Sequence, residues 1–167
     1  SSAKSFEYIA EHFEEYLNEP SPKLSAQADC CLKREPMGVV VLIVPWNYPL
    51  LIACWKLASA LAAGNTVILK PSSLTPLTAL ELASIIHDAG LPKGVVSVIN
   101  GPGEKIGRWL CEDKRVDMIS FTGSNEVGRR IMEYSSACIK KLTMELGGKS
   151  ASIILKDADL EVAVNGA

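Results

Sequence analysis

A tryptophan and an asparagine stand between two prolines in the stretch VPWNYPL, residues 44–50, directly after a continuous apolar run. Tight turns are usually built from small or turn-forming residues such as Gly, Asp and Ser. The indole of Trp46 and the amide of Asn47 therefore indicate a purpose other than turn formation.

Glu145 ends an apolar stretch in MELGGKS and is followed by two glycines. The apolar neighbours Met144 and Leu146 would restrict its hydration, which raises the pKa of a carboxyl group toward the range of a general base. A surface glutamate beside a turn is the alternative, and spacing alone does not separate the two.

The segment FTGSNEVGRR places Gly123 and Gly128 where a strand passes into a helix. Exposed amides at a helix start suit a phosphate, Gly123 would let the backbone approach closely, and the Ser124 hydroxyl could donate to it. The alternative is a helix capped by Ser124 whose Gly128 only packs against the sheet.

Two other segments carry weaker signals. GPGEKIG, residues 101–107, has the spacing GxGxxxG rather than the dinucleotide fingerprint GxGxxG, and on its own a Gly/Pro-rich turn between a strand and a helix is the favoured interpretation. Lys70 in KPSS could bind ribose hydroxyls or a phosphate, although a solvated lysine at a strand end is the simpler interpretation.

The composition excludes several classes of function. Among 167 residues there are 17 Lys and Arg against 19 Asp and Glu, so nothing favours a nucleic-acid or acidic-membrane partner. No apolar stretch reaches the roughly 18 residues of a membrane span. The first residues lack the pattern of a signal peptide, and we expect a cytoplasmic protein.

The cysteines predict no metal site. Five cysteines and two histidines occur without a CxxC pair, and we interpret the neighbouring Cys30 and Cys31 as reduced structural thiols.

The periodicity predicts alternating strands and helices, and therefore an α/β fold with a doubly wound, mostly parallel, Rossmann-like sheet. Ligands in such sheets bind beyond the carboxyl ends of the strands. Strands are predicted at 38–44, 65–70, 94–100, 116–121, 139–146 and 150–156, and helices at 6–17, 50–64, 75–90, 104–113, 124–136 and from 157 onward.

Taken in order, these segments resemble the NAD(P)-dependent aldehyde dehydrogenase superfamily over about residues 34–167. The stretches that carry the resemblance are REPMGVVVLIVPWNYPLL, WKLASALAAGNTVILKPSSLTPLTALELA, AGLPKGVVSVINGPG, ISFTGSNEVGRRI and LTMELGGKSASIILKDADLE. Within the superfamily, the segments PWNYPL and ACWK resemble those of betaine-aldehyde-like members. The resemblance implies an N-terminal helix and linking segment at 1–33 and an NAD(P)-binding domain at 34–167, truncated at its C-terminal end.

The resemblance also assigns roles. Asn47 matches the amide of the oxyanion hole, which answers the question raised by its position. Glu145 matches the base that activates water for thioester hydrolysis. Lys56 matches its proton-relay partner, or is a lysine snorkelling from an amphipathic helix. The residues implied to contact the cofactor are Val44, Pro45, Trp46, Lys70, Ser72, Ser73, Gly103, Gly123, Ser124, Val127, Gly128 and Leu146.

Within that set, Lys70 would hold the adenine-side ribose and Gly103 would line the adenine pocket. Members of the family that prefer NAD usually carry an acid where this chain has Ser73. A serine can accept a 2′-phosphate that a carboxylate would repel, so we expect use of NADP at least as good as use of NAD.

The family's nucleophilic cysteine lies beyond the matched glutamate, and none of the five cysteines here stands in its motif. We therefore expect the chain to be the cofactor-binding part of an enzyme that oxidises a small aldehyde to an acid through a cysteine thiohemiacetal. The whole enzyme would be a homo-oligomer, and this chain alone would be inactive. A stand-alone dinucleotide-binding or interaction module without catalysis is the alternative, and a reductase using GPGEKIG is a third.

Overall fold

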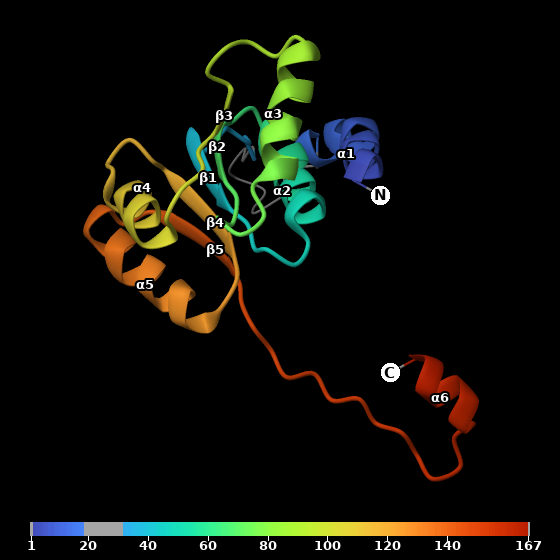
Figure 1. Ribbon diagram of the computed structural model, residues 1–167. Helices are drawn as coiled ribbons and strands as arrows, with labels where there is room; N and C mark the ends of the chain where they lie inside the picture. The colour runs from blue at the N-terminus through green and yellow to red at the C-terminus, as the bar shows by residue number, and fades with distance from the viewer. Residues whose placement is uncertain (1, 19–31, 167) are drawn as a thin grey trace, which may run out of the picture.

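A five-stranded parallel sheet forms the centre of the computed structural model, which describes residues 2–18 and 32–166 (Figure 1). The strands lie in the order β3-β2-β1-β4-β5, and each neighbouring pair is parallel. This order reverses between β1 and β4, as in doubly wound nucleotide-binding sheets, and the predicted α/β fold is confirmed. The strands are β1 (Val39–Ile43), β2 (Thr66–Lys70), β3 (Val96–Val98), β4 (Met118–Thr122) and β5 (Lys141–Glu145).

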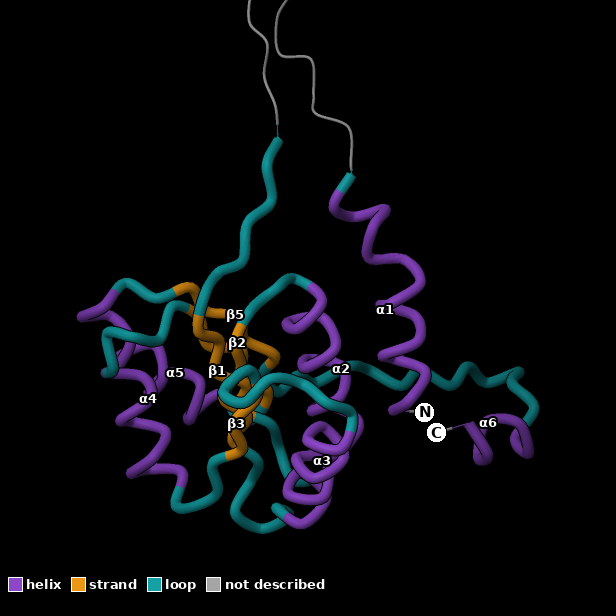
Figure 2. The backbone as a smooth tube through the Cα atoms, turned by 90° about the horizontal axis from the view of Figure 1, so that it is seen from above, coloured by secondary structure: helices purple, strands orange, loops and turns teal. Residues whose placement is uncertain are grey.

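The helices cover both faces of the sheet, and Figure 2 shows α2 and α3 on one side of the strands and α4 and α5 on the other. The helix α1 packs on the outside of α2. The helices are α1 (Ser2–Leu17), α2 (Pro49–Ala62), α3 (Leu77–Asp88), the π-helical turn η1 (Gly103–Gly107), α4 (Arg108–Glu112), α5 (Asn125–Ser135), the 3₁₀ turn η2 (Ser136–Cys138) and α6 (Leu160–Gly166).

The strand β1 is buried on both faces, as its continuous apolar sequence predicts. Because successive side chains of a strand point to opposite faces, Val40 and Leu42 pack with Leu57 of α2. Val41 packs on the other face with Ile131 of α5. The sheet therefore separates two apolar cores, and each core fixes the helices of one face.

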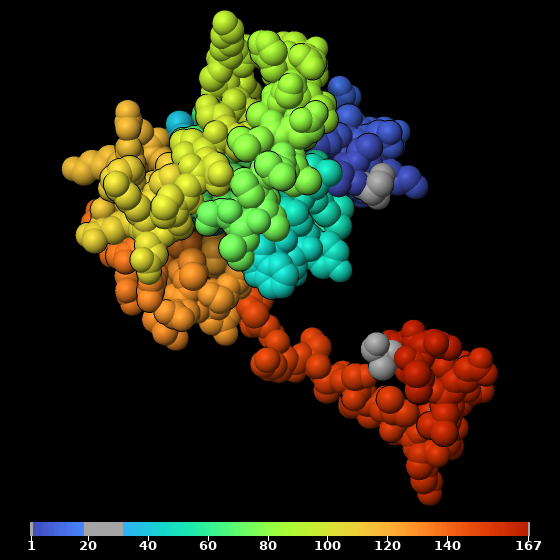
Figure 3. Space-filling model, viewed as in Figure 1, coloured from blue at the N-terminus to red at the C-terminus, as the bar shows by residue number. Residues whose placement is uncertain are grey.

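One predicted strand is wrong. Residues 150–156 form no strand, and the segment leaves the sheet after β5 and leads to α6 (Figure 1). Figure 3 shows this tail standing apart from the body of the molecule. A strand needs a neighbouring strand to satisfy its backbone groups, and the apolar side chains of Ile153 and Leu155 are exposed here. Apolar and β-branched composition alone suggested a strand for this segment.

The predicted helix at 104–113 is divided into η1 and the short α4. Glycines begin and end η1, and a π-helical turn widens the backbone spiral at that place. This difference matters for function because η1 forms one wall of a cavity.

Buried thiols agree with a structural role for the cysteines. Cys54 in α2 and Cys111 in α4 are free and buried, and burial raises the pKa of both thiols. Cys30 and Cys31 lie outside the described residues. Residues 2–18 and 32–166 contain no group of His, Cys, Asp and Glu side chains suited to a metal ion. In the same ranges no helix is long and apolar enough to cross a membrane.

We expect Cys54 and Cys111 to resist alkylation in the folded chain, because only an accessible thiolate reacts quickly. Iodoacetamide labelling at pH 8, followed by peptide mass spectrometry, should leave both unmodified until denaturant is added. Labelling of either thiol at the rate of a free peptide would contradict this packing.

Candidate active site and nucleotide cavity

The candidate catalytic residues lie at the carboxyl edge of the sheet. Glu145 is the last residue of β5 and pairs in register with Thr122 of β4. Asn47 lies in the loop between β1 and α2, at the same edge. Because neighbouring strands are about 4.8 Å apart, β1 and β5 are separated by about 10 Å across β4. Both residues therefore lie just after or at the end of strands, where the sequence predicted ligand-binding residues.

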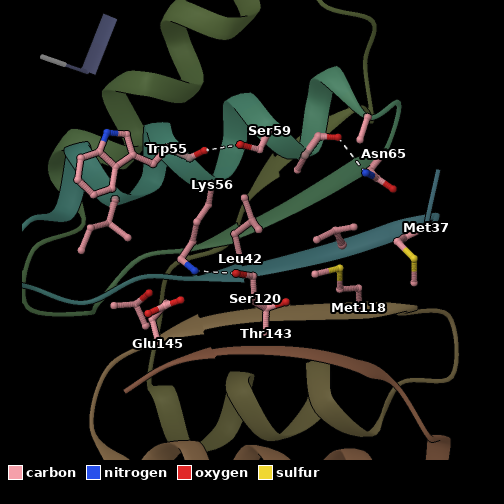
Figure 4. A pocket seen from close by; sticks show the side chains of 15 residues that line it. Met37, Leu42, Trp55, Lys56, Ser59, Asn65, Met118, Ser120, Thr143 and Glu145 are labelled. Carbon is pink, nitrogen blue, oxygen red and sulfur yellow. Dashed lines mark hydrogen bonds between the residues drawn. The ribbon is translucent and has the colours of Figure 1, made fainter. Parts of the chain in front are cut away.

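A cavity of about 650 Å³ opens on the face of the sheet that carries α2, and we call it the α2-face cavity (Figure 4). It contains both Lys56, from α2, and Glu145, from β5. Its lining residues are Met37, Val40, Leu42, Ile52, Trp55, Lys56, Ser59, Ala60, Ala63, Asn65, Met118, Ser120, Thr122, Thr143 and Glu145.

The ammonium of Lys56 reaches from α2 to the sheet, where it donates a 2.6 Å hydrogen bond to the Ser120 hydroxyl (Figure 4). Burial lowers the pKa of Lys56, and the negative charge of Glu145 partly opposes this effect. The structure thus brings together the two residues to which the family resemblance assigns a proton relay.

The expected shielding of Glu145 by its neighbours is wrong, because Glu145 is exposed. Adjacent side chains of a strand point to opposite faces, so Met144 packs into the core on the other face. Leu146 follows the strand and contacts the position of Gly128 in α5. Neither side chain covers the carboxylate.

The loop that precedes α2 holds Trp46 and Asn47, and both are exposed, Trp46 to 62%. The carbonyl of Trp46 accepts a hydrogen bond from the Thr75 hydroxyl, which ties the loop to the segment before α3. Neither residue lines the α2-face cavity. The oxyanion role of Asn47 and the cofactor contact of Trp46 stay predictions.

A second cavity, of about 530 Å³, lies on the opposite face of the sheet between η1 and α5, and we call it the α5-face cavity. Three of the residues predicted to bind the cofactor line it, namely Lys70, Gly103 and Val127. The complete lining is Ile43, Lys70, Gly103, Glu104, Gly107, Arg108, Val127, Arg130, Ile131 and Tyr134.

Lys70 is almost completely buried, and burial lowers its pKa. Its ammonium donates to the carbonyl of Pro71 at 3.1 Å, which among the described residues is its one hydrogen bond. An ammonium has three donors, so the group retains capacity for a ligand. A Cβ added to Gly103 or Gly107 would meet nothing within 4 Å, which leaves open space along η1.

Two arginines of this cavity were missed by sequence reasoning. Arg130 of α5 bridges Glu104 of η1 at 3.1 Å and Glu126 at 2.8 Å, and so ties the two walls together. Arg108 pairs with Glu112 at 2.8 Å within α4. The helical spacing of Arg130 from Val127 places both on one face and could have indicated it.

The remaining predicted cofactor residues do not line this cavity. Ser124 caps α5 by accepting from the Val127 amide at 3.3 Å, as expected. A Cβ on Gly123 would lie 2.4 Å from the Phe121 ring, and one on Gly128 would lie 2.6 Å from Leu146. Close packing therefore accounts for both glycines, and a phosphate contact stays a prediction for them, as do cofactor contacts for Val44, Pro45, Ser72, Ser73 and Leu146.

We expect Glu145→Gln to lower the pKa of Lys56 further, because the substitution removes the negative charge that now raises it. An NMR titration of the labelled lysine side chains would show the midpoint of Lys56 moving to lower pH. Lys70, on the other face, serves as the internal control and should titrate unchanged. A Lys56 midpoint that stays in place would mean that the two charges do not interact.

The model of the aldehyde dehydrogenase family matches residues 1–167. The betaine aldehyde dehydrogenase of Bacillus subtilis is 50% identical over 153 residues, which are 92% of this chain and 30% of that protein. PnpE in complex with nicotinamide adenine dinucleotide is 42% identical, with a TM-score of 0.89 over 99% of this chain and 34% of that one. A variant of aldehyde dehydrogenase C from Pseudomonas syringae, in complex with NAD⁺ and octanal, is 42% identical, with a TM-score of 0.84 over 99% and 33% of the two chains. The chain thus spans about 30% of the length of its curated relative.

Proposed function

The chain belongs to the aldehyde dehydrogenase family, and we propose that it is the nucleotide-binding part of an enzyme that oxidises an aldehyde to a carboxylic acid with NAD(P). The α5-face cavity carries this proposal. It lies beside the point where the strand order reverses, which is where doubly wound sheets bind nucleotides. The relatives in complex with NAD⁺ and, in one case, octanal support the same ligands here.

The residues of this cavity fit the adenosine half of a dinucleotide. Its volume of about 530 Å³ is typical of small-molecule sites. The Lys70 ammonium would donate to ribose hydroxyls, and Gly103 and Val127 would leave flat surfaces for the base. A bound dinucleotide would supply the hydride acceptor for the oxidation.

On the other face, Glu145 would accept a proton from the water that hydrolyses the thioester, and its exposure leaves it accessible to that water. Lys56 would exchange the proton with Glu145 from within the α2-face cavity. Asn47 would donate a hydrogen bond from its side-chain amide to the aldehyde oxygen, which becomes negatively charged when the carbonyl carbon is attacked. These three roles divide proton transfer and charge stabilisation between the loop before α2, the helix α2 and the end of strand β5.

The cofactor preference would depend on Ser73, which is exposed in the segment after β2. A serine leaves room for a 2′-phosphate and can donate to it. We therefore propose that the enzyme uses NADP at least as well as NAD. A kcat/KM for NAD tenfold or more above that for NADP would refute this preference.

Calorimetric titration of the chain with NAD⁺ tests the binding proposal. We expect Lys70→Met to weaken binding by about tenfold or more, because it removes the charged donor and keeps the side-chain volume. Lys141→Met is the matched control, since Lys141 is an exposed lysine of β5 that does not line the cavity. Equal affinities for all three proteins would remove Lys70 from the nucleotide site.

Ser73→Glu addresses the choice of cofactor separately. The added carboxylate should reduce NADP affinity by about tenfold and change NAD affinity much less, because only the former carries a 2′-phosphate. The same titration measures both. A parallel loss for both nucleotides would show that Ser73 does not face the 2′ position.

A further inference from the structure

Ser120 of β4 is the hydrogen-bond acceptor of the Lys56 ammonium, and no other described residue accepts from this group. The donor–acceptor distance is 2.6 Å, and the Ser120 residue is only 7% exposed. A bond from a charged donor is stronger than one between neutral groups. An ammonium cannot accept, so the hydroxyl hydrogen of Ser120 must point elsewhere.

Ser120 also begins a row of polar side chains along the floor of the α2-face cavity. It pairs in register with Thr143 of β5, and Thr122 pairs with Glu145. Residues two apart in a strand share a face, so the three hydroxyls and the carboxylate lie together, and all four line the cavity. Figure 4 shows Ser120, Thr143 and Glu145 beneath the Lys56 side chain.

The rest of the described cavity lining supplies no other charged partner for the Lys56 ammonium. Lys56 and Glu145 are the titratable side chains among the lining residues, and the lining on the sheet also includes apolar side chains such as Leu42 and Met118. The helix α1, which packs on α2, contributes no residue to the lining. The position of the charge therefore depends on Ser120 and on the carboxylate.

We propose that Ser120 is a positioning residue of the catalytic site, which holds the Lys56 ammonium on the floor of the α2-face cavity beside Glu145. This inference rests on the proposed function for the roles of Lys56 and Glu145. The hydroxyl favours the charged form of the lysine and fixes its direction. Without it, the ammonium keeps its partly buried place but loses its acceptor, and the charged form becomes less stable.

An NMR titration of Lys56 in the labelled chain tests the proposal. We expect the midpoint to move to lower pH in Ser120→Ala and to stay in place in Ser120→Thr, which keeps a hydroxyl. Ser59→Ala is the matched control, because Ser59 lines the same cavity but donates to the Trp55 carbonyl. Two-dimensional amide spectra check that each variant is folded.

Ser120→Val provides a second variant, which has the shape of Ser120→Thr but no hydroxyl, and it should also lower the midpoint. An unchanged midpoint in Ser120→Ala or Ser120→Val would overturn the proposal, as would an equal shift in Ser59→Ala. NAD⁺ affinity should stay within about twofold in every variant, because Lys70 lies on the other face. Failure of the Lys70→Met titration would refute the proposed nucleotide site and leave this result standing.

Discussion

Glu145→Gln is expected to reduce the turnover of a full-length aldehyde dehydrogenase that contains this chain by about a hundredfold or more, as loss of a general base does. The amide keeps the size of the carboxylate but cannot take a proton from water. The exposed position of Glu145 at the end of β5 leaves the fold little affected by the change. Steady-state kinetics with a small aldehyde would measure the loss.

A pre-steady-state experiment separates this role from a general loss of activity. If Glu145 acts on the hydrolytic water, Glu145→Gln should still release a first equivalent of NAD(P)H rapidly and then become slow. Glu161→Gln, an exposed glutamate in α6, is a suitable control and should retain its turnover. Retention of full steady-state turnover by Glu145→Gln would exclude Glu145 as the base.

Asn47→Ala is expected to lower kcat by about a hundredfold to a thousandfold, the effect of removing one donor from an oxyanion hole, about 3 to 4 kcal/mol of barrier. Asn47 is exposed in the loop between β1 and α2, so the substitution should leave the stability of the fold nearly unchanged. Here the first equivalent of NAD(P)H should itself appear slowly, in contrast to Glu145→Gln.

Asn47→Asp tests the sign of the charge that forms. A carboxylate of the same shape would repel an oxyanion and should be at least as damaging as alanine. The exposed Asn125 at the start of α5 gives a control, because Asn125→Ala should retain activity. Normal kcat in Asn47→Ala would show that this amide does not face the reacting carbon.

The sequence predicted the sheet well because its buried strands are unmistakable. The run that forms β1 is apolar at every position, and a strand must be buried on both faces to have such a sequence. Gly64 and Gly90 stop α2 and α3 with φ values of +78° and +82°, as helix-ending glycines should. Local chemistry decides these features, and so the sequence reveals them.

The features that the sequence predicted wrongly or did not reveal depend on the tertiary fold, and local sequence does not specify them. Residues 150–156 have the composition of a strand, but pairing depends on a neighbour that local sequence does not specify. The predicted shielding of Glu145 from water is wrong because its sequence neighbours Met144 and Leu146 pack on the other face of the sheet, toward α5. Ser120 and Arg108 could be recognised only from the fold, which places Ser120 against Lys56 and Arg108 in the same cavity as Lys70.

The central claim is that the two faces of the sheet have separate tasks, nucleotide binding in the α5-face cavity and proton transfer in the α2-face cavity. The most direct measurement follows the backbone amide signals of the labelled chain while NAD⁺ is added. We expect saturable shifts of the amide signals of Gly103, Val127 and Tyr134, and no change in those of Ser59 and Met118. Shifts confined to Ser59 and Met118, or no saturable shift at all, would contradict it.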